Sequence, residues 1–409
     1  MELLEILQSA KDAQKIIANL QDSTRNEVLC AMANEIVAQK NAIIKANAID
    51  INNAQDSKLS APMIERLKLD SYKIDLIAEA IKDIAGLKSP LGRTIDGWVN
   101  YKGLRIQKVS VPIGVIAMIY ESRPNVTSDS FALCFKSGNV CVLKGGKEAL
   151  HSNRAIVAIL HSVLVRFAIP KEAICFIDNR EATQTLLKCD KFIDLVIPRG
   201  GENLIRFVSE NSTIPVIKHD KGVCHLYIHS DCDKNSAIKI ALNAKISKPS
   251  ACNSIECILV HKDFAHLADL VNALQKNGVE IRACESIAKR FALKNVRDSD
   301  FYNEYNDLIV NLKCVDSPES AIAHIAKYGS SHSEAILTND LAVAQKFANE
   351  VDSACVFVNT STRFCDGGEF GFGAEIGIST SKLHARGPMG IESLVSYKYK
   401  IFGNGEVRE

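Results

Sequence analysis

The sequence predicts an α/β protein with two apposed α/β domains built on parallel sheets, plus a short oligomerisation tail. The chain has 409 residues, and at roughly 150 residues per domain this length suggests two or three domains. From about residue 140 onward, short apolar runs alternate with helical patterns, which is typical of βαβ units and of parallel sheets. The sequence has no low-complexity tract and no long linker. We therefore expect closely apposed domains, with the ligand site in the cleft between them.

The individual elements follow from periodicity. Residues 1 to about 90 are helical in pattern, because apolar residues recur at spacings of three and four. Pro90, Gly92 and Gly97 then break the pattern, and residues 105–120 read as two strands around Pro112-Ile113-Gly114. Further strands are expected at 140–145, 173–177, 192–198, 214–217, 223–229, 254–260, 279–283, 307–315, 334–337 and 354–359, and helices at 147–167, 181–187, 202–210, 234–246, 262–276, 317–327 and 340–349. The alternating strand 223–229 is expected to close the first unit, which gives segments 1–230, 231–380 and 381–409.

Charge and composition exclude several classes of protein. The formal net charge is +1, so we expect no nucleic-acid or membrane partner. Residues 1–16 carry early acids and no apolar core, unlike a signal peptide. The longest apolar stretch, 111–120, is about half of the ~20 residues that a membrane helix needs. A cytoplasmic location is therefore expected, and the 13 cysteines, none in CxxC spacing, are expected to be free and mostly buried thiols.

One cysteine occupies an unusual place. Cys252 lies between a loop at Lys248 and the strand 254–260, at the entrance of that strand. A thiolate there is a strong nucleophile if nearby positive charge, such as Lys245 or Lys248, lowers its pKa. The alternative is a small buried core residue, which is the interpretation expected for Cys257 inside the strand.

A thiol that attacks a carbonyl also needs hydrogen-bond donors for the oxyanion. Asn125 follows Pro124, after an apolar strand and at the start of a helix. Its side-chain amide is a candidate donor, and a helix N-cap is the alternative.

Two glycine turns join strands to helices. Gly200 and Gly201 let the backbone approach a ligand and leave helix N–H groups free for a phosphate. Lys144 and Lys147 flank a second turn at the end of a parallel strand, where ligands of open sheets bind. Neither turn is G-x-G-x-x-G, so each alone could be a tight β–α turn. Together they suit a dinucleotide.

A set of ordered motifs runs along the chain. The motifs are SRPN (122–125), VLKGGKEA (142–149), VIPRGGENL (196–204), PSACNSIECILVH (249–261), YNEYNDLIVNLKCV (302–315), HIAKYGSSHSEAIL (324–337) and the glycine-rich block 359–390. Through these motifs the chain resembles the gamma-glutamyl phosphate reductases, a branch of the aldehyde dehydrogenase superfamily, over about residues 1–403. The blocks around Cys252, His332 and Gly371 are specific to this branch, whereas the glycine turns are common to the superfamily.

The resemblance implies an aldehyde-dehydrogenase-like fold and a defined reaction. L-glutamyl 5-phosphate would be reduced by NADPH to L-glutamate 5-semialdehyde with release of phosphate, the second step of proline biosynthesis. Residues 1–230 would bind NADP, 231–380 would carry the nucleophile, and 381–409 would return to the first domain and the subunit interface. The implied roles are catalytic thiol for Cys252, oxyanion donor for Asn125, adenosine-ribose contact for Lys144, phosphate turn for Gly200 and Gly201, and nicotinamide-ribose contact for Glu304.

Two departures from the wider superfamily refine this expectation. Lys147 stands where many aldehyde dehydrogenases have a glutamate, and its charge would attract the 2′-phosphate of NADP. Segment 216–228 lacks the glutamate that activates water in hydrolytic members, although Asp220 leaves that question open. The alternatives are a hydrolytic aldehyde dehydrogenase and a non-catalytic nucleotide-binding protein on the same fold.

Substrate contacts rest on residue chemistry. Arg123 and Arg363 are candidates for the substrate α-carboxylate, because guanidinium pairs well with carboxylates; a surface or ion-pair role is the alternative. His332 could line the substrate pocket or pair with a buried carboxylate. No metal site is expected, because His225 and His229 on one strand face would lie about 13 Å apart.

The tail also suggests a partner. Residues 393–403 alternate like an edge strand, which often pairs with another subunit. In the superfamily such a tail builds a dimer, so we expect a homo-oligomer, a dimer or a multiple of dimers. A complex with the preceding kinase is left open by the sequence.

Overall fold

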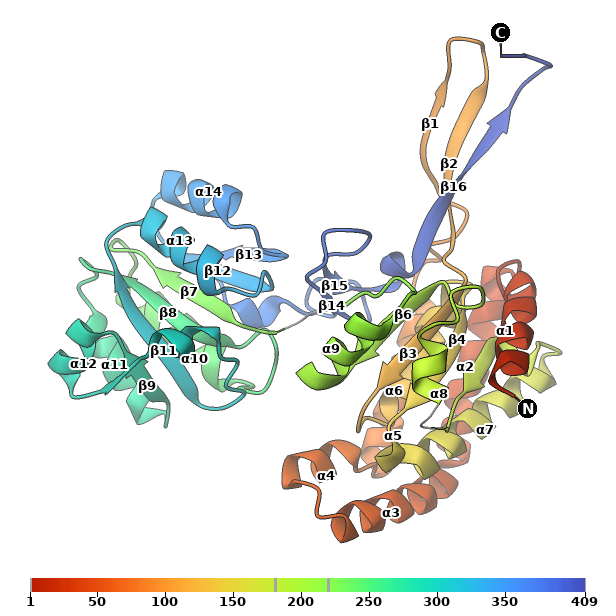
Figure 1. The fold of residues 1–409 in the computed structure, drawn as a ribbon, viewed down its shortest axis with the longest axis horizontal. Helices are drawn as coiled ribbons and strands as arrows, with labels where there is room; N and C mark the ends of the chain where they lie inside the picture. Colours follow the sequence, from red (N-terminus) through yellow and green to blue (C-terminus); the bar gives the residue numbers. More distant parts are fainter. Residues whose placement is uncertain (1, 180–181, 219–220, 409) are drawn as a thin grey trace. The chain divides into compact units, whose positions relative to one another are not determined.

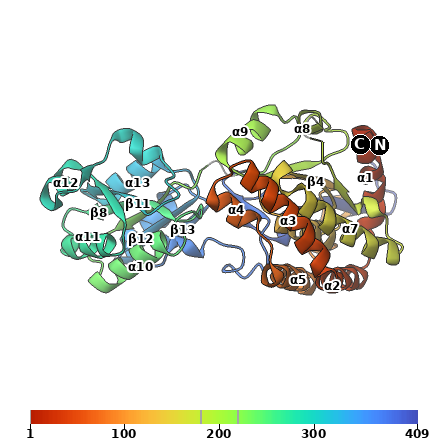
Figure 2. The same ribbon diagram turned by 90° about the horizontal axis from the view of Figure 1, so that it is seen from below.

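The helical pattern of the N-terminal region is confirmed in the computed structural model, which describes residues 2–179, 182–218 and 221–408. In α5 the buried residues Ile74, Ile77, Ile81 and Ile84 recur at spacings of three and four, which gives the helix one apolar face. Helices α2 (Asp22–Ala38) and α5 (Ser71–Gly86) pack against each other, and α2 also packs on α7 (Leu150–Arg166) (Figure 2). The helices are α1 (Leu3–Ile17), α2 (Asp22–Ala38), α3 (Lys40–Asp56), α4 (Ala61–Leu67) and α5 (Ser71–Gly86).

The chain divides into two units. The first comprises Met1–Lys218, Gly371–Gly377 and Met389–Glu409, and the second comprises His219–Phe370 and Ile378–Pro388. This division differs from the expected boundary at residue 230. The reason is that the strand at 224–228 pairs with strands of the second unit rather than closing the first.

A four-stranded parallel sheet forms the centre of the first unit. Its order is β5-β4-β3-β6, and every residue of β3 and β4 is buried, as expected for strands covered on both faces. Tyr120 at the end of β3 lies opposite Gly145 of β4 and Arg199 of β6, so the loops that follow these three strands start at one edge of the sheet. The elements are β3 (Val115–Tyr120), α6 (Asn125–Lys136), β4 (Val140–Gly145), η1 (Lys147–Ala149), α7 (Leu150–Arg166), η2 (Lys171–Ala173), β5 (Ile174–Phe176), α8 (Ala182–Leu186), β6 (Leu195–Arg199) and α9 (Glu202–Asn211).

A second, antiparallel sheet of this unit contains the tail. Strands β1 (Thr94–Val99), β2 (Arg105–Pro112) and β16 (Val395–Phe402) pair in that order and extend away from the parallel sheet (Figure 1). The tail is therefore an edge strand, as the alternation predicted. Strand β1 is not predicted from the sequence, because all six of its residues are exposed and no buried face marks it.

The second unit is built on a seven-stranded sheet in the order β10-β9-β11-β8-β7-β12-β13, and the strand pairs between described residues are all parallel. Alternate residues of each strand face opposite sides. Leu226 packs in a core with residues of α10, α11 and α12, whereas Tyr227 packs with residues of α13 and α14 on the other face. The elements are β7 (Cys224–Ile228), α10 (Lys234–Ile246), β8 (Ile255–His261), α11 (Leu267–Lys276), β9 (Glu280–Ala283), α12 (Glu285–Phe291), β10 (Lys294–Asn295), η3 (Asp298–Tyr302), β11 (Ile309–Val315), α13 (Pro318–Tyr328), β12 (Ser333–Leu337), α14 (Leu341–Glu350), β13 (Cys355–Val358) and η4 (Thr362–Phe364).

The remaining segments are short. Strands β14 (Gly377–Ser379) and β15 (Gly387–Met389) form a two-stranded sheet, followed by η5 (Ile391–Leu394). The expected strand 214–217 is reduced to a single bridge between Val196 and Val216. Among the described residues, no helix combines the length and apolar character needed to cross a bilayer.

Candidate active site

Cys252 lies in a turn immediately before β8, as the sequence predicted. The turn is closed by backbone bonds from Ala251 N–H to Lys248 O (3.0 Å) and from Ser254 N–H to Ala251 O (2.9 Å). Cys252 is partly exposed, whereas Cys257 inside the strand is fully buried. The two thiols therefore have different access to a substrate.

The residue after the cysteine is held by the segment 362–365. The Asn253 side-chain amide donates to Cys365 O (2.8 Å), and Thr362 Oγ1 donates to Asn253 O (2.6 Å). The Arg363 guanidinium donates from Nη1 to Asn253 Oδ1 and from Nε to Ser247 Oγ (3.1 Å). These bonds give Arg363 a positioning role beside Cys252; its contact with a substrate carboxylate stays a prediction.

On its other side, the Cys252 backbone contacts Gly222 and Cys224. The Cys224 thiol donates to Cys252 O (3.2 Å). A Cβ added at Gly222 would lie 2.2 Å from Cys252 O and 2.7 Å from its Cα, so only glycine fits at this position. His332 is buried, with Nδ1 2.9 Å from Ser333 Oγ and 3.7 Å from Cys224 Sγ. His332 therefore contacts Cys224, which in turn contacts the Cys252 backbone.

Lysines were expected near the thiol. Lys245 is fully buried at the end of α10, and its ammonium lies 2.8 Å from the buried Glu256 carboxylate. Burial raises the pKa of Glu256 to about 8, although the Lys245 charge opposes the rise. Lys248 is exposed. The charge of Lys245 is therefore partnered by Glu256 on β8.

Asn125 occupies the first turn of α6 in the first unit. Its side-chain amide donates to Asp129 Oδ2 (2.9 Å), one turn further along the helix. Burial raises the pKa of Asp129 to about 6, although the bonds from Asn125 and Ser128 oppose the rise. Pro124, rather than Asn125, is the N-cap, and no side chain caps this helix. The amide is thus held by Asp129 and is not used as a cap.

The loop that carries Asn125 is attached to the second glycine turn. Glu148 Oε1 accepts from Ser122 N–H (2.7 Å) and Ser122 Oγ (2.9 Å). A Cβ at Gly145 would lie 2.4 Å from Asn153 Nδ2, and one at Gly146 would lie 2.2 Å from Glu148 Oε1. Gly145 therefore packs closely against Asn153, whereas the close neighbour of Gly146 is the flexible end of the Glu148 side chain.

The glycine turn before α9 lies at the same edge. Gly201 N–H donates to Glu121 Oε2 (3.0 Å), and a Cβ at Gly200 would lie 2.5 Å from that oxygen. The start of α9 thus already receives a carboxylate, at the kind of position where a phosphate binds. Glu121 was missed on the sequence, although it directly precedes the SRPN motif.

Comparisons with known proteins agree on one family. The model described as "Aldehyde dehydrogenase family" matches residues 1–290. A gamma-glutamyl phosphate reductase of Wolinella succinogenes is 54% identical over 98% of this chain and 99% of its own, and one of Nautilia profundicola is 51% identical over 99% and 100%. The chain belongs to the gamma-glutamyl phosphate reductase family. It is therefore an oxidoreductase of the aldehyde dehydrogenase superfamily.

Solved structures support the same family and fold. The crystal structure of a gamma-glutamyl phosphate reductase from Thermotoga maritima superimposes with a TM-score of 0.98 at 41% identity and covers 100% of both chains. An acetylating aldehyde dehydrogenase from Geobacillus thermoglucosidasius has a TM-score of 0.70 at 18% identity, covering 99% of this chain and 97% of its own. The second likeness shows the fold alone. The expected aldehyde-dehydrogenase-like α/β fold is confirmed.

As in other aldehyde dehydrogenases, a nicotinamide cofactor is used by the gamma-glutamyl phosphate reductase family. Lys144 is buried at the end of β4, where Nζ donates to Gly145 O (3.0 Å), and Lys147 is exposed at the start of η1. Lys144 lies near the end of β4, and Gly200 and Gly201 follow β6; these two strands flank β3 in one sheet. This arrangement fits a dinucleotide at the carboxyl edge of the first unit's sheet.

The remaining expected site residues lie on loops. Arg123 is exposed in the loop before α6, and Glu304 is partly buried in the loop before β11. Glu304 lies close enough to raise the pKa of Glu256 through its charge. The roles expected for Arg123 and Glu304 stay predictions, and Asp220 lies outside the described residues.

Proposed function

We propose that this chain reduces L-glutamyl 5-phosphate to L-glutamate 5-semialdehyde with NADPH and releases phosphate, the second step of proline biosynthesis. The observation that carries the proposal is the Cys252 turn. It presents a partly exposed thiol at the entrance of β8 and is held by Asn253, Gly222 and Cys224. Relatives that are 51–54% identical over nearly the whole chain carry the name of this reductase.

The chemistry begins at the thiol. The Cys252 thiolate attacks the carbonyl carbon of the acyl phosphate, and the C–O bond to phosphate breaks with its electron pair on phosphate. The Asn125 amide donates to the carbonyl oxygen while it carries negative charge, because Asp129 holds the amide in one orientation. The product on the enzyme is a Cys252 thioester.

NADPH, when bound, supplies the hydride that reduces this thioester. The resulting thiohemiacetal releases the aldehyde, and a proton returns to the Cys252 sulfur. Gly200 and Gly201 would hold the phosphates at the start of α9, Lys144 a ribose and Glu304 the nicotinamide ribose. Lys147 is exposed beside η1, so its charge is available to a 2′-phosphate and favours NADP over NAD.

Substrate recognition and assembly complete the proposal. Arg123 is proposed to bind the substrate α-carboxylate, with Arg363 and His332 shaping the pocket around the Cys252 turn. The first unit is proposed as the NADP-binding unit and the second as the catalytic unit. Exposed Tyr397, Tyr399 and Ile401 on the edge strand β16 support a homo-oligomer formed through this strand.

The decisive experiment runs the reaction in the oxidative direction. Purified protein with glutamate 5-semialdehyde and NADP should give sustained NADPH formation only when phosphate or arsenate is present. Without them, a burst of about one NADPH per active site should stop at the thioester, because water attacks thioesters slowly without a positioned base. Sustained turnover to glutamate in phosphate-free buffer would favour the hydrolytic alternative.

A further inference from the structure

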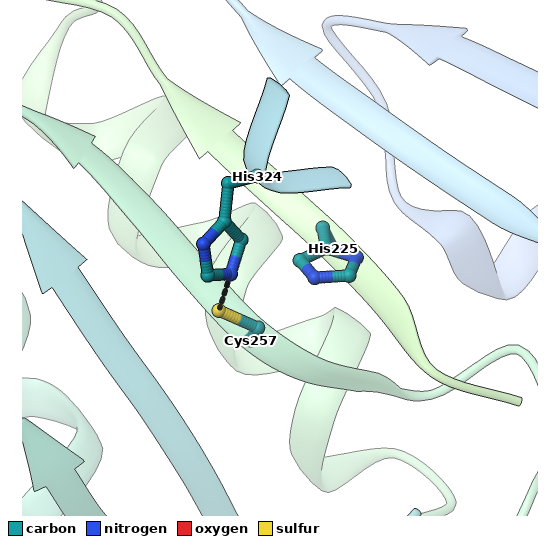
Figure 3. A group of neighbouring side chains, drawn as sticks. All are labelled: His225, Cys257 and His324. Atoms are coloured by element: carbon teal, nitrogen blue, oxygen red, sulfur yellow. Dashed lines mark hydrogen bonds between the residues drawn. The ribbon is translucent and has the colours of Figure 1, made fainter. Parts of the chain in front are cut away.

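Three buried side chains from three elements meet in the second unit, apart from the Cys252 turn. His225 comes from β7, Cys257 from β8 and His324 from α13 (Figure 3). His225 and Cys257 are direct partners in the pairing of the two strands, and both point to the face covered by α13. The potential ligand atoms of the three residues lie within 4.8 Å of one another. From the sequence, His229 was the partner considered for His225 in a metal site, and it is too far away. Only the fold brings Cys257 and His324 close to His225.

One nitrogen in this cluster has no hydrogen-bond partner among the residues that the structure describes. His225 Nδ1 lies 3.0 Å from Glu334 Oε2, which also accepts from His225 N–H (2.7 Å). With Nδ1 donating to the carboxylate, Nε2 carries the lone pair. This Nε2 is buried and makes no hydrogen bond within the described residues. A buried acceptor without a partner costs free energy, so a ligand that uses this lone pair would remove a cost.

The geometry of His225 is that of a metal-binding histidine. Such histidines commonly donate their second ring nitrogen to a carboxylate, which fixes the tautomer and increases the basicity of the ligand nitrogen. Glu334 supplies this carboxylate from the neighbouring strand β12, and it is fully buried. The orientation of His225 is therefore set before any ion arrives.

His324 completes the set from the helix side. Its Nε2 lies 3.9 Å from Cys257 Sγ (Figure 3), and its Nδ1 lies 3.1 Å from Lys313 Nζ. An ammonium group can only donate, so Nδ1 carries the lone pair and the ring is neutral in this arrangement. In the ion-free state the Lys313 ammonium donates to Nδ1, and the Nε2 proton points toward the sulfur.

We propose that His225 Nε2, Cys257 Sγ and His324 Nε2 bind a thiophilic d¹⁰ cation, Zn²⁺ or Cu⁺, with Glu334 as the outer carboxylate. One thiolate and two imidazoles suit both ions. On binding, the Cys257 thiol loses its proton to solvent, and the His324 proton moves from Nε2 to Nδ1 as the Lys313 ammonium turns away. One proton is therefore released per ion, and Lys313 can turn because it is partly exposed.

The ion would link three elements of the second unit. It joins β7, β8 and α13, and it leaves no polar atom of His225 unpaired. His225 directly follows Cys224, whose thiol donates to Cys252 O, and Cys257 lies on the strand that begins after the Cys252 turn. An ion here would stabilise the strands that support this turn. The three ligands can bind the ion whatever reaction Cys252 performs.

The first test uses the unmodified chain. Metal-free protein is loaded with Zn²⁺, or in a separate arm with Cu⁺, in competition with a chromogenic chelator, and the loaded sample is examined by X-ray absorption. We expect one tightly bound ion with two nitrogens at about 2.0 Å and one sulfur at about 2.3 Å, and one proton released. Because Cys355 Sγ and Cys365 Sγ lie 3.5 Å apart and could bind metal themselves, a Cys355→Ser/Cys365→Ser variant is the control and should bind equally. A shell with two or more sulfurs, or no ion bound in either arm, would overturn the proposal.

Variants give an independent test, because some should weaken ion binding and one should strengthen it. Cys257→Ala and His324→Gln should lose the site, and Glu334→Gln should weaken binding by about 10- to 100-fold, as for other outer-shell partners. Lys313→Met should bind the ion more tightly than the wild type, because it removes the ammonium that competes for His324. A gain in affinity cannot come from misfolding. Unchanged or weaker binding by Lys313→Met, or unchanged binding by Cys257→Ala, would contradict the assignment.

Discussion

The Asn125 amide donates to Asp129 Oδ2 over 2.9 Å, between two residues one turn apart on α6. A side-chain amide has two N–H donors, so this bond orients the group and leaves its second donor for an oxyanion. The bond also depends on a carboxyl group whose pKa is raised to about 6 by burial. Under the proposed mechanism, activity and stability are therefore linked at this pair.

Asp129→Asn should stabilise the protein at pH 8 and have little effect at pH 4. The folded-state pKa is raised from 3.8 to about 6, so the folded state binds the proton more tightly, and the wild type gains stability as the pH falls through this window. The full shift corresponds to about 3 kcal/mol, and partial exposure of Asp129 reduces the expected gain at pH 8 to about 1–2 kcal/mol. Denaturant midpoints at the two pH values measure it. Asp56→Asn, at an exposed site of α3, is the control, and an equal gain at both pH values would refute the explanation.

Cys252→Ala should abolish turnover while the fold and cofactor binding persist. Cys252 is partly exposed in its turn, and the loss of one side-chain sulfur there leaves the backbone bonds of Asn253 intact. Turnover, circular dichroism and NADPH titration measure the three properties. Cys30→Ala removes an exposed thiol on α2 and should keep full activity. Near-normal turnover of Cys252→Ala would rule out the thioester mechanism.

Gly222→Ala should displace the Cys252 turn. The added Cβ would lie 2.2 Å from Cys252 O, and both groups are backbone-attached, so neither can move cheaply. We expect a loss of about 1–3 kcal/mol in stability, typical of overpacking, with a fall in kcat. Gly86→Ala is the matched control, because its Cβ would meet nothing within 4 Å in α5. If both variants kept wild-type kcat, Gly222 would have no role in placing the thiol.

Glu121→Gln should tighten NADPH binding. The Glu121 carboxylate accepts from Gly201 N–H at the start of α9 (3.0 Å), and its negative charge there opposes the approach of a phosphate. Removing a charge at a helix terminus changes binding by about 0.3–1 kcal/mol, which is roughly a two- to fivefold change in Kd. Fluorescence titration with NADPH measures it. Glu210→Gln makes the same charge change at the exposed far end of α9, and an equal effect there would show that the position of Glu121 is unimportant.

Lys147→Glu should weaken NADPH binding far more than NADH binding. Lys147 is exposed at the start of η1, and opposite charges about 4 Å apart interact by about 4 kcal/mol at an effective dielectric constant of 20, before desolvation. The ratio of the two Kd values is the measurement. Lys171→Glu on η2 reverses an exposed charge elsewhere in the unit and should leave the ratio unchanged. A wild-type protein that binds NADH as tightly as NADPH would contradict the argument.

Much of the fold could be predicted from the sequence because its signals are local. Helix α10 was predicted at its observed limits, 234–246, because apolar spacing is continuous there and Asp233 caps the start by accepting from Asn235 and Ser236 N–H groups. The place of Cys252 at the entrance of β8 was likewise visible, because a loop and an apolar run adjoin it. The family motifs added the reaction class and the NADP expectation.

Only the tertiary structure decided which separate segments meet. The sequence pattern of strand β7 is compatible with the last strand of one sheet or with a strand of the next. Its pairing with β8 and β12 places it in the second unit. Glu121 reaches Gly201 across 80 positions, and His324 reaches Cys257 across 67. The physical reason is that helix and strand patterns depend on neighbours along the chain, whereas the partners of a carboxylate, thiol or imidazole depend on how the strands are ordered in the sheet and which helix covers each face.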